Sequence, residues 1–178
     1  MSESDFEIAN EQQLPGDILT SSARGIRQRF KHLEKKNGSF KGMVSKHMKD
    51  LFGIHSLRLG EESGLPTVNF IISEGDHETE IIHTGEALRK VFTSLVLFFT
   101  LVATEEQERV FLVEEPEAHL YSSLQKSFAE LLLRLAKEHH VQLFLTTNSN
   151  IFLEAVKLFV SGYTACSSLK NHNMLRLK

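Results

Sequence analysis

The chain contains a single cysteine, Cys166, so it cannot form an intrachain disulfide and is expected in a reducing compartment. It has no apolar N-terminal run of the kind found in secretory signals. Its most hydrophobic window, residues 91–102, is far shorter than the roughly 20 apolar residues that a membrane-spanning helix needs, and it is better interpreted as a buried helix. The net charge of −3 over 178 residues points to no particular polyanion or membrane partner. These absences predict a cytoplasmic domain with a core of its own.

The most informative stretch is residues 110–119, in which an apolar run ends in two adjacent carboxylates and a proline. It reads Val-Phe-Leu-Val-Glu-Glu-Pro-Glu-Ala-His. A buried parallel strand gives such a run, and ligands of open α/β sheets bind beyond the carboxyl ends of the strands. Neighbouring strand residues point in opposite directions, so Glu114 can face a hydrated magnesium ion while Glu115 faces an attacking water. Alternatively, the two glutamates only solvate the strand end and favour the start of the next helix.

A helix and a second strand are expected to follow. Residues 121–139 carry one apolar face at helical spacing, made by Leu124, Phe128, Leu131, Leu132 and Leu135. A second apolar run, residues 141–145, then ends in Thr146-Thr147-Asn148-Ser149. Strand, helix and strand in this order are typical of a right-handed parallel crossover, so both polar strand ends should share one edge of a sheet.

These segments closely resemble the C-terminal half of ABC-type ATPase heads, of which the closest type is the AAA-like ATPases of overcoming-lysogenisation-defect nucleases and RecF-like proteins. The resemblance covers residues 57–161 and is strongest over residues 110–150. It implies an α/β fold with a parallel sheet of the P-loop-NTPase type, and ATP and Mg²⁺ as ligands. In that resemblance residues 110–115 are the Walker B strand, Glu114 holds Mg²⁺ through water, and Glu115 orients or activates the attacking water.

The same resemblance assigns the segments that follow. Residues 117–121, which include His119, match the loop that crosses to a partner head, and residues 146–149 match the switch that senses the γ-phosphate. The family normally has a histidine where this chain has Asn148. Asparagine can donate a hydrogen bond but cannot carry a proton or a positive charge, which is a departure at a catalytic position.

Upstream, residues 81–86 read Ile-Ile-His-Thr-Gly-Glu and precede an apolar helix expected over about residues 87–102. They resemble the family's signature segment, which implies that Thr84, Gly85 and Glu86 meet the nucleotide held by an opposite protomer. Thr84 is expected to be the N-cap, and Gly85 would let the backbone approach a phosphate closely. A threonine and a glycine at a helix start are also a common cap with no ligand.

No segment of the sequence matches Gly-x-x-x-x-Gly-Lys-[Ser/Thr], the Walker A loop that holds the nucleotide phosphates. We therefore interpret the chain as the C-terminal half of an ATPase head: a split subunit, a product of truncation or gene decay, or a fragment of a longer protein. It would hydrolyse ATP when a Walker A-bearing lobe complements it, with ATP-dependent dimerisation expected. The alternative is a catalytically inactive interaction or regulatory lobe that pairs with a complete ATPase.

Three regions are expected along the chain: a polar, weakly ordered segment over residues 1–22, a basic helical arm over residues 23–53, and the ATPase lobe over residues 54–178. The arm should break at Asn37-Gly38, and short strands are expected at residues 56–58, 67–73 and 79–83. The basic residues of the arm are Arg24, Arg27, Arg29, Lys31, Lys35, Lys36, Lys41, Lys46 and Lys49. They either contact DNA phosphates or form the solvated face of the helices.

Overall fold

The computed structural model describes residues 33–34, 38–54, 56–61, 68–74, 76–103, 109–159 and 173–177. The expected polar segment and the first part of the basic arm lie outside these residues. The chain forms two compact units, residues 1–100 and residues 101–178. Within the described part of the chain, no helix combines the length and the apolar character needed to cross a membrane.

In the first unit, the second helix of the basic arm is confirmed. Leu33 and Glu34 are helical, and α2 (Phe40–Phe52) begins after a turn at Gly38, close to the predicted break. The backbone N–H of Lys41 donates to the carboxylate of Glu34 at 2.6 Å. The helix ends at Gly53, which has a left-handed φ of 71° and donates its N–H to the carbonyl of Lys49 at 2.8 Å.

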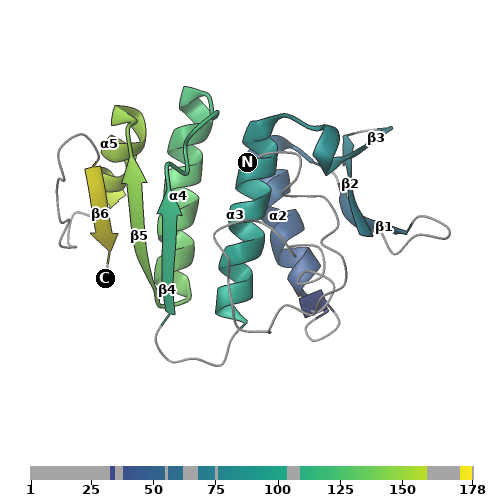
Figure 1. Cartoon of the computed structure of the whole chain (residues 1–178), viewed down its shortest axis with the longest axis horizontal. Coiled ribbons are helices and arrows are strands. Elements are labelled where there is room, and N and C mark those ends of the chain that lie inside the picture. Colours follow the sequence, from purple (N-terminus) through teal and green to yellow (C-terminus); the bar gives the residue numbers. More distant parts are fainter. Residues whose placement is uncertain are drawn as a thin grey trace. The chain divides into compact units, whose positions relative to one another are not determined.

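A three-stranded antiparallel sheet follows α2, in the order β1-β2-β3 (Figure 1). Its strands are β1 (Ser56–Glu61), β2 (Val68–Glu74) and β3 (His77–Glu80). The prediction of a strand through residue 83 was wrong, because residues Ile81–His83 form the 3₁₀ turn η2. Both the hydroxyl and the backbone N–H of Thr84 donate to the carbonyl of Ile81, at 2.6 and 3.2 Å, and so close this turn.

The long helix α3 (Glu86–Val102) is buried along most of its length, as its apolar sequence predicts. The ring of Phe99 meets Phe40 of α2 edge-on, with 6.5 Å between the ring centroids, and stacks on His47 at 5.7 Å. The buried hydroxyls of Ser94 and Thr100 donate to carbonyls one turn earlier. Hydroxyl groups are therefore tolerated within this apolar helix.

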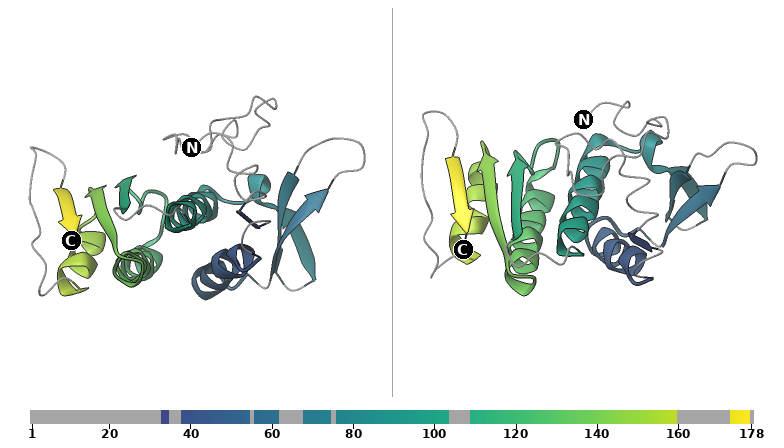
Figure 2. Two further views of the ribbon diagram at one scale, coloured as in Figure 1. Left: turned by 90° about the horizontal axis from the view of Figure 1, so that it is seen from below. Right: turned by 60° about the horizontal axis from the view of Figure 1, so that its bottom comes forward.

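The second unit contains the predicted crossover. β4 (Arg109–Glu114) and β5 (Val141–Thr147) are parallel, and α4 (Ser122–Glu138) connects them. α5 (Asn150–Phe159) and β6 (Asn173–Leu177) complete the unit, and β6 pairs antiparallel with β5. The order of the described strands is β4-β5-β6, and Figures 1 and 2 show α4 and α5 on the same side of this sheet. The predicted α/β fold with a parallel strand pair is confirmed.

One face of β4 is not buried, contrary to the prediction for this strand. Phe111 points to the covered face of the sheet and is buried, whereas Val110 and Leu112 are 43% and 74% exposed. The reason is geometric: successive strand residues alternate between faces, and α4 and α5 cover one face only. The predicted apolar face of α4 is confirmed, with Leu124, Phe128, Leu132 and Leu135 buried.

Candidate functional site

The polar ends of β4 and β5 lie side by side, as the crossover predicts. Glu114 is in register with Thr146 across the parallel pair. The next residue, Glu115, donates its backbone N–H to the carbonyl of Thr146 at 3.0 Å and lies 3.3 Å from the hydroxyl oxygen of the same residue. The ladder thus extends one residue beyond β4 and fixes the backbone of Glu115 against the end of β5.

Glu115 has an unusual backbone conformation, with φ at +42°. Residues with a side chain rarely adopt this left-handed region, and such conformations concentrate at functional sites. The turn breaks the direction of β4, and Pro116 after it cannot continue the ladder. As a result the carboxylate of Glu115 reaches the side-chain amide of Asn148, whose Nδ2 donates to Oε1 of Glu115. The two predicted catalytic side chains are therefore in contact.

Glu117 contributes a third carboxyl group that the sequence analysis did not single out as a site residue. It is only 5% exposed, and its Oε1 accepts hydrogen bonds from the hydroxyl of Thr147 at 2.5 Å and the N–H of Asn148 at 3.0 Å. Its Oε2 is buried with no hydrogen-bond partner among the described residues. The sequence shows a glutamate directly after the proline that ends the strand. No sequence pattern indicates that its carboxyl turns inward.

In the rest of the connecting loop, His119 and Tyr121 face solvent, whereas Leu120 is buried. His119 is exposed and has a left-handed φ of 67°, and Tyr121 is 63% exposed at the start of α4. On the β5 side, Ser149 caps α5, because its hydroxyl oxygen accepts the N–H of Phe152 at 3.2 Å. The exposed part of the site thus consists of the carboxylates of Glu114 and Glu115, the amide of Asn148 and the loop that bears His119.

Glu114 is the residue that the sequence analysis predicts to hold Mg²⁺ through water. Its side chain is exposed at the polar edge of the sheet, and no cluster of three or more His, Cys, Asp or Glu side chains with metal-ligand geometry occurs among the described residues. Mg²⁺ keeps several waters and is bound through one or two carboxylates together with substrate phosphates. The role of Glu114 in holding Mg²⁺ stays a prediction.

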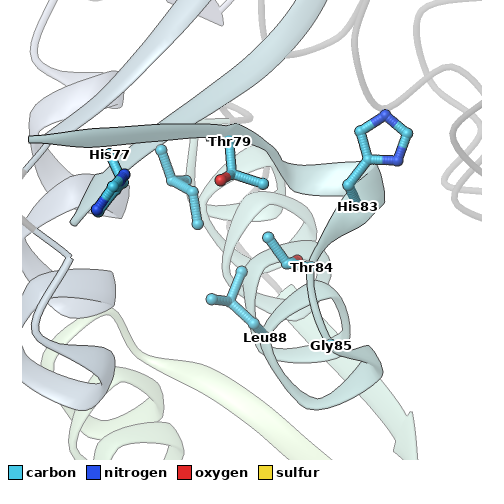
Figure 3. A pocket seen from close by; sticks show the side chains of 7 residues that line it. His77, Thr79, His83, Thr84, Gly85 and Leu88 are labelled. Atoms are coloured by element: carbon cyan, nitrogen blue, oxygen red, sulfur yellow. The ribbon is translucent and has the colours of Figure 1, made fainter.

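In the first unit, two of the three predicted signature residues line a pocket of about 250 Å³ (Figure 3). Thr84 and Gly85 contribute to its wall, whereas Glu86, the first residue of α3, does not. The full lining is Ile72, His77, Thr79, His83, Thr84, Gly85 and Leu88, and Figure 3 shows the two imidazoles on opposite sides of the pocket.

The predicted N-cap role of Thr84 is wrong. Its hydroxyl donates to the carbonyl of Ile81 and therefore closes the 3₁₀ turn instead of capping α3. Gly85 occupies the position before the helix, and its carbonyl accepts the N–H groups of Leu88 and Arg89 at 3.1 and 3.2 Å. Because Gly85 has no side chain, the N-terminal backbone of α3 is open to the pocket, where the helix dipole favours negative charge.

With this geometry described, the sequence can be compared with known protein families. The family model of the AAA ATPase domain matches residues 2–153. The chain belongs to this family. As an AAA ATPase domain it is expected to bind nucleotide, which agrees with the paired carboxylates at the end of β4. No curated protein matches the sequence.

Solved structures that match this chain include heads of SMC ATPases. An SMC ATPase described for ATP-driven dimerization and DNA-stimulated activation has a TM-score of 0.56 and 16% identity, with 83% of this AAA domain and 89% of that chain covered. An SMC head bound to the C-winged helix domain of ScpA has a TM-score of 0.57 and 16% identity, with 86% and 53% covered. The SMC head domain from Thermotoga maritima has a TM-score of 0.51 and 14% identity, with 85% and 52% covered.

At these identities the likeness establishes the fold, which is that of the ABC- and SMC-type ATPase heads. The AAA domain spans about half the length of two of the three structures. The predicted α/β fold class is therefore confirmed, and the predicted roles of single residues stay predictions.

Proposed function

We propose that this AAA domain forms the Walker B, signature and switch part of an ATP-hydrolysing head, of the overcoming-lysogenisation-defect and RecF-like kind. The observation that carries the proposal is the contact between the carboxylate of Glu115 and the amide of Asn148 at the shared edge of β4 and β5. Two polar side chains from neighbouring strand ends converge there, one of them on a backbone that a side chain disfavours. Such an arrangement supports a catalytic role better than solvation of a strand end does.

In the proposed reaction, water attacks the γ-phosphorus of ATP and the bond to the bridging oxygen of ADP breaks, which releases ADP and phosphate. Glu115 orients the water or accepts its proton, and Asn148 donates a hydrogen bond at the same place. Glu114 would hold Mg²⁺ through water, and the ion would neutralise charge on the phosphates. The roles of Glu115 and Asn148 require only that the nucleotide is delivered to this edge.

Delivery of the nucleotide is assigned to a second lobe. The sequence contains no Walker A motif, so the proposal requires a Walker A-bearing lobe or subunit and ATP-dependent pairing with it. Within the first unit, the pocket at Gly85 would take phosphate oxygens of a nucleotide held by the partner, and His119 on the exposed loop would approach the same partner. ATP-driven dimerization is described for one SMC ATPase of the same fold, which supports this arrangement.

The basic arm is proposed as a contact with DNA in a DNA-related or phage-defence system located in the cytoplasm. Its described part, α2, buries Phe40, Val44 and Met48 and leaves Lys46 and Lys49 exposed. Lysines on the exposed side of a helix are suited to nonspecific contact with phosphates.

The first test is a titration of the purified chain with a fluorescent ATP analogue and magnesium. Three proteins are compared: the wild type, Glu114→Ala, and the control Glu130→Ala, which removes an exposed carboxylate from the middle of α4. Saturable binding that is lost in Glu114→Ala but kept in the control would support a nucleotide site at the end of β4. Binding that is equal in all three would contradict the role given to Glu114.

If the chain alone binds no nucleotide at millimolar concentrations, the titration is repeated with the polypeptide that supplies the Walker A loop. In that complex Glu115→Gln should abolish turnover and leave binding intact, since the amide keeps the shape of the side chain but cannot accept a proton. Full turnover by Glu115→Gln would remove this residue from its role. Binding without turnover in the wild-type complex would favour the catalytically inactive interaction lobe.

A further inference from the structure

A closed ring of hydrogen bonds lies behind the Glu115–Asn148 pair, on the inner side of the site. It begins at Glu117, whose Oε1 accepts the hydroxyl proton of Thr147 at 2.5 Å. The hydroxyl oxygen of Thr147 in turn accepts the backbone N–H of Ser149 at 3.0 Å. This half of the ring connects the loop after β4 to the residues that follow β5.

The second half returns to the same loop through α4. The hydroxyl of Ser149 donates to Oε1 of Gln125 at 2.6 Å, and Nε2 of Gln125 donates to the carbonyl of Leu120 at 2.7 Å. The N–H of Leu120 then donates to the carbonyl of Glu117 at 3.0 Å, which closes the ring. We call these five residues, Glu117, Leu120, Gln125, Thr147 and Ser149, the hydrogen-bond ring.

The hydrogen-bond ring holds Asn148 on both sides. Its neighbours in sequence, Thr147 and Ser149, are both members, and its own N–H donates to Glu117 at 3.0 Å. Thr147 is fully buried and Glu117 nearly so, whereas the side chain of Asn148 is exposed and reaches Glu115. The ring, of which Glu117, Leu120 and Thr147 are buried, therefore fixes the backbone from which the exposed amide projects.

Holding the loop through the carboxyl of Glu117 lowers the stability of the fold. Its Oε2 is buried without a partner among the described residues, and burial of an unsatisfied polar atom lowers stability. The two donors that converge on Oε1 define a geometry that an apolar side chain could not define. We therefore expect Glu117 to contribute more to the position of the loop than to the net stability of the fold.

We infer that Glu117 is a positioning residue that holds Asn148 against Glu115 through the hydrogen-bond ring. The structural part of this inference concerns only the second unit. Its catalytic part rests on the proposed function, because Asn148 and Glu115 act on ATP only if the domain hydrolyses it.

The structural part is tested by amide hydrogen exchange on the whole chain without nucleotide. Glu117→Ala removes the acceptor of the Asn148 N–H, so exchange at Asn148 should become about tenfold faster, the effect of losing one hydrogen bond. The N–H of Ser149 should also exchange faster, since Thr147 loses the group that orients its hydroxyl. Glu117→Gln keeps an acceptor oxygen and should restore protection, and Glu130→Ala should leave exchange at Asn148 unchanged.

The amides of Leu143 and Leu145 in β5 report whether the effect is local. Unchanged exchange at Asn148 in Glu117→Ala would overturn the inference, and so would equal acceleration at Leu143, Leu145 and Asn148, which would indicate general loosening of the unit. Should Glu117→Ala fail to fold, Thr147→Val replaces it, since the methyl group matches the hydroxyl in size but cannot bond to Glu117 or Ser149. The amide of Ser149 then loses its acceptor and should exchange faster. The amide of Asn148 should also exchange faster, because Glu117 loses the hydroxyl that holds its carboxylate in place.

The catalytic part is tested in the ATP-hydrolysing complex. Glu117→Ala should lower kcat about tenfold and leave KM for ATP unchanged, with recovery in Glu117→Gln, because the loss concerns placement of Asn148 and not the binding of ATP. A change in KM alone would contradict this part. If Glu117→Ala speeds exchange locally but neither the wild type nor any variant hydrolyses ATP, the proposed function is refuted and the structural role of Glu117 stands.

Discussion

The left-handed backbone of Glu115 gives a prediction that needs no nucleotide. Glu115→Ala and Glu115→Gly both remove the carboxylate and its bond to Asn148, so this loss cancels between the two variants. They differ in the free energy of holding φ at +42°, which is unfavourable for alanine and not for glycine. Glu115→Gly should therefore be the more stable of the two, although glycine usually destabilises a folded chain.

The size of the effect follows from two opposing contributions. Relief of the left-handed conformation is worth about 1–2 kcal/mol, and the greater entropy that glycine loses on folding costs about 0.5–1 kcal/mol. The net advantage of Glu115→Gly over Glu115→Ala is thus about 0–1.5 kcal/mol, centred on about 0.75 kcal/mol. Glu130 provides the matched control because it lies exposed within α4, where glycine is about 1 kcal/mol less stable than alanine.

The assay is thermal unfolding of the four variants, followed by circular dichroism. For a chain of this length 1 kcal/mol corresponds to roughly 2–4 °C in Tm. Glu115→Gly should melt above Glu115→Ala, and Glu130→Gly below Glu130→Ala. A glycine penalty of the same sign and size at both positions would refute the claim that the backbone of Glu115 is strained.

Two further predictions concern the core and the basic arm. Phe128 is fully buried on α4, so Phe128→Ala should lower the free energy of unfolding by about 3–5 kcal/mol. Ser127→Ala, at an exposed neighbouring position, should change it by less than about 0.5 kcal/mol. Urea unfolding measures both values, and similar losses would contradict the assigned buried face of α4. Changing Lys46 and Lys49 singly to glutamate should each weaken double-stranded DNA binding and lower the slope of log K against log salt by about 1. The same single charge change at the exposed Lys157 of α5 should not. Equal losses for the three variants in fluorescence anisotropy titrations would argue against a contact by the arm.

The segment from β4 to β5 could be predicted from sequence because its signals are local and agree with one another. The apolar run before Glu114, the helical spacing from Leu124 to Leu135 and the second run after Val141 each specify an element, and the crossover rule places their polar ends together. The convergence of Glu115 and Asn148 follows from that rule. Neither the contact of their side chains nor the left-handed turn at Glu115 is encoded in any spacing.

Other features depend on tertiary geometry, and the sequence analysis missed them. The inward turn of Glu117 depends on the direction in which the chain leaves Glu115, and the hydroxyl of Thr84 bonds to Ile81 because a 3₁₀ turn precedes α3. The exposure of Leu112 was also missed, because a continuous apolar run does not reveal how many faces of a strand are covered.

The exposed face of β4 also leads to an expectation about how this protein behaves at high concentration. β4 is the last strand on one side of the described sheet β4-β5-β6, and Val110 and Leu112 project from its uncovered face. A strand edge with apolar side chains is a template on which other chains add as further strands. Charged residues or proline usually blunt such edges, but between Arg109 and Glu114 this strand carries neither. We therefore expect Leu112→Lys, which places a charge on the exposed face of this edge strand, to raise the solubility of the isolated chain.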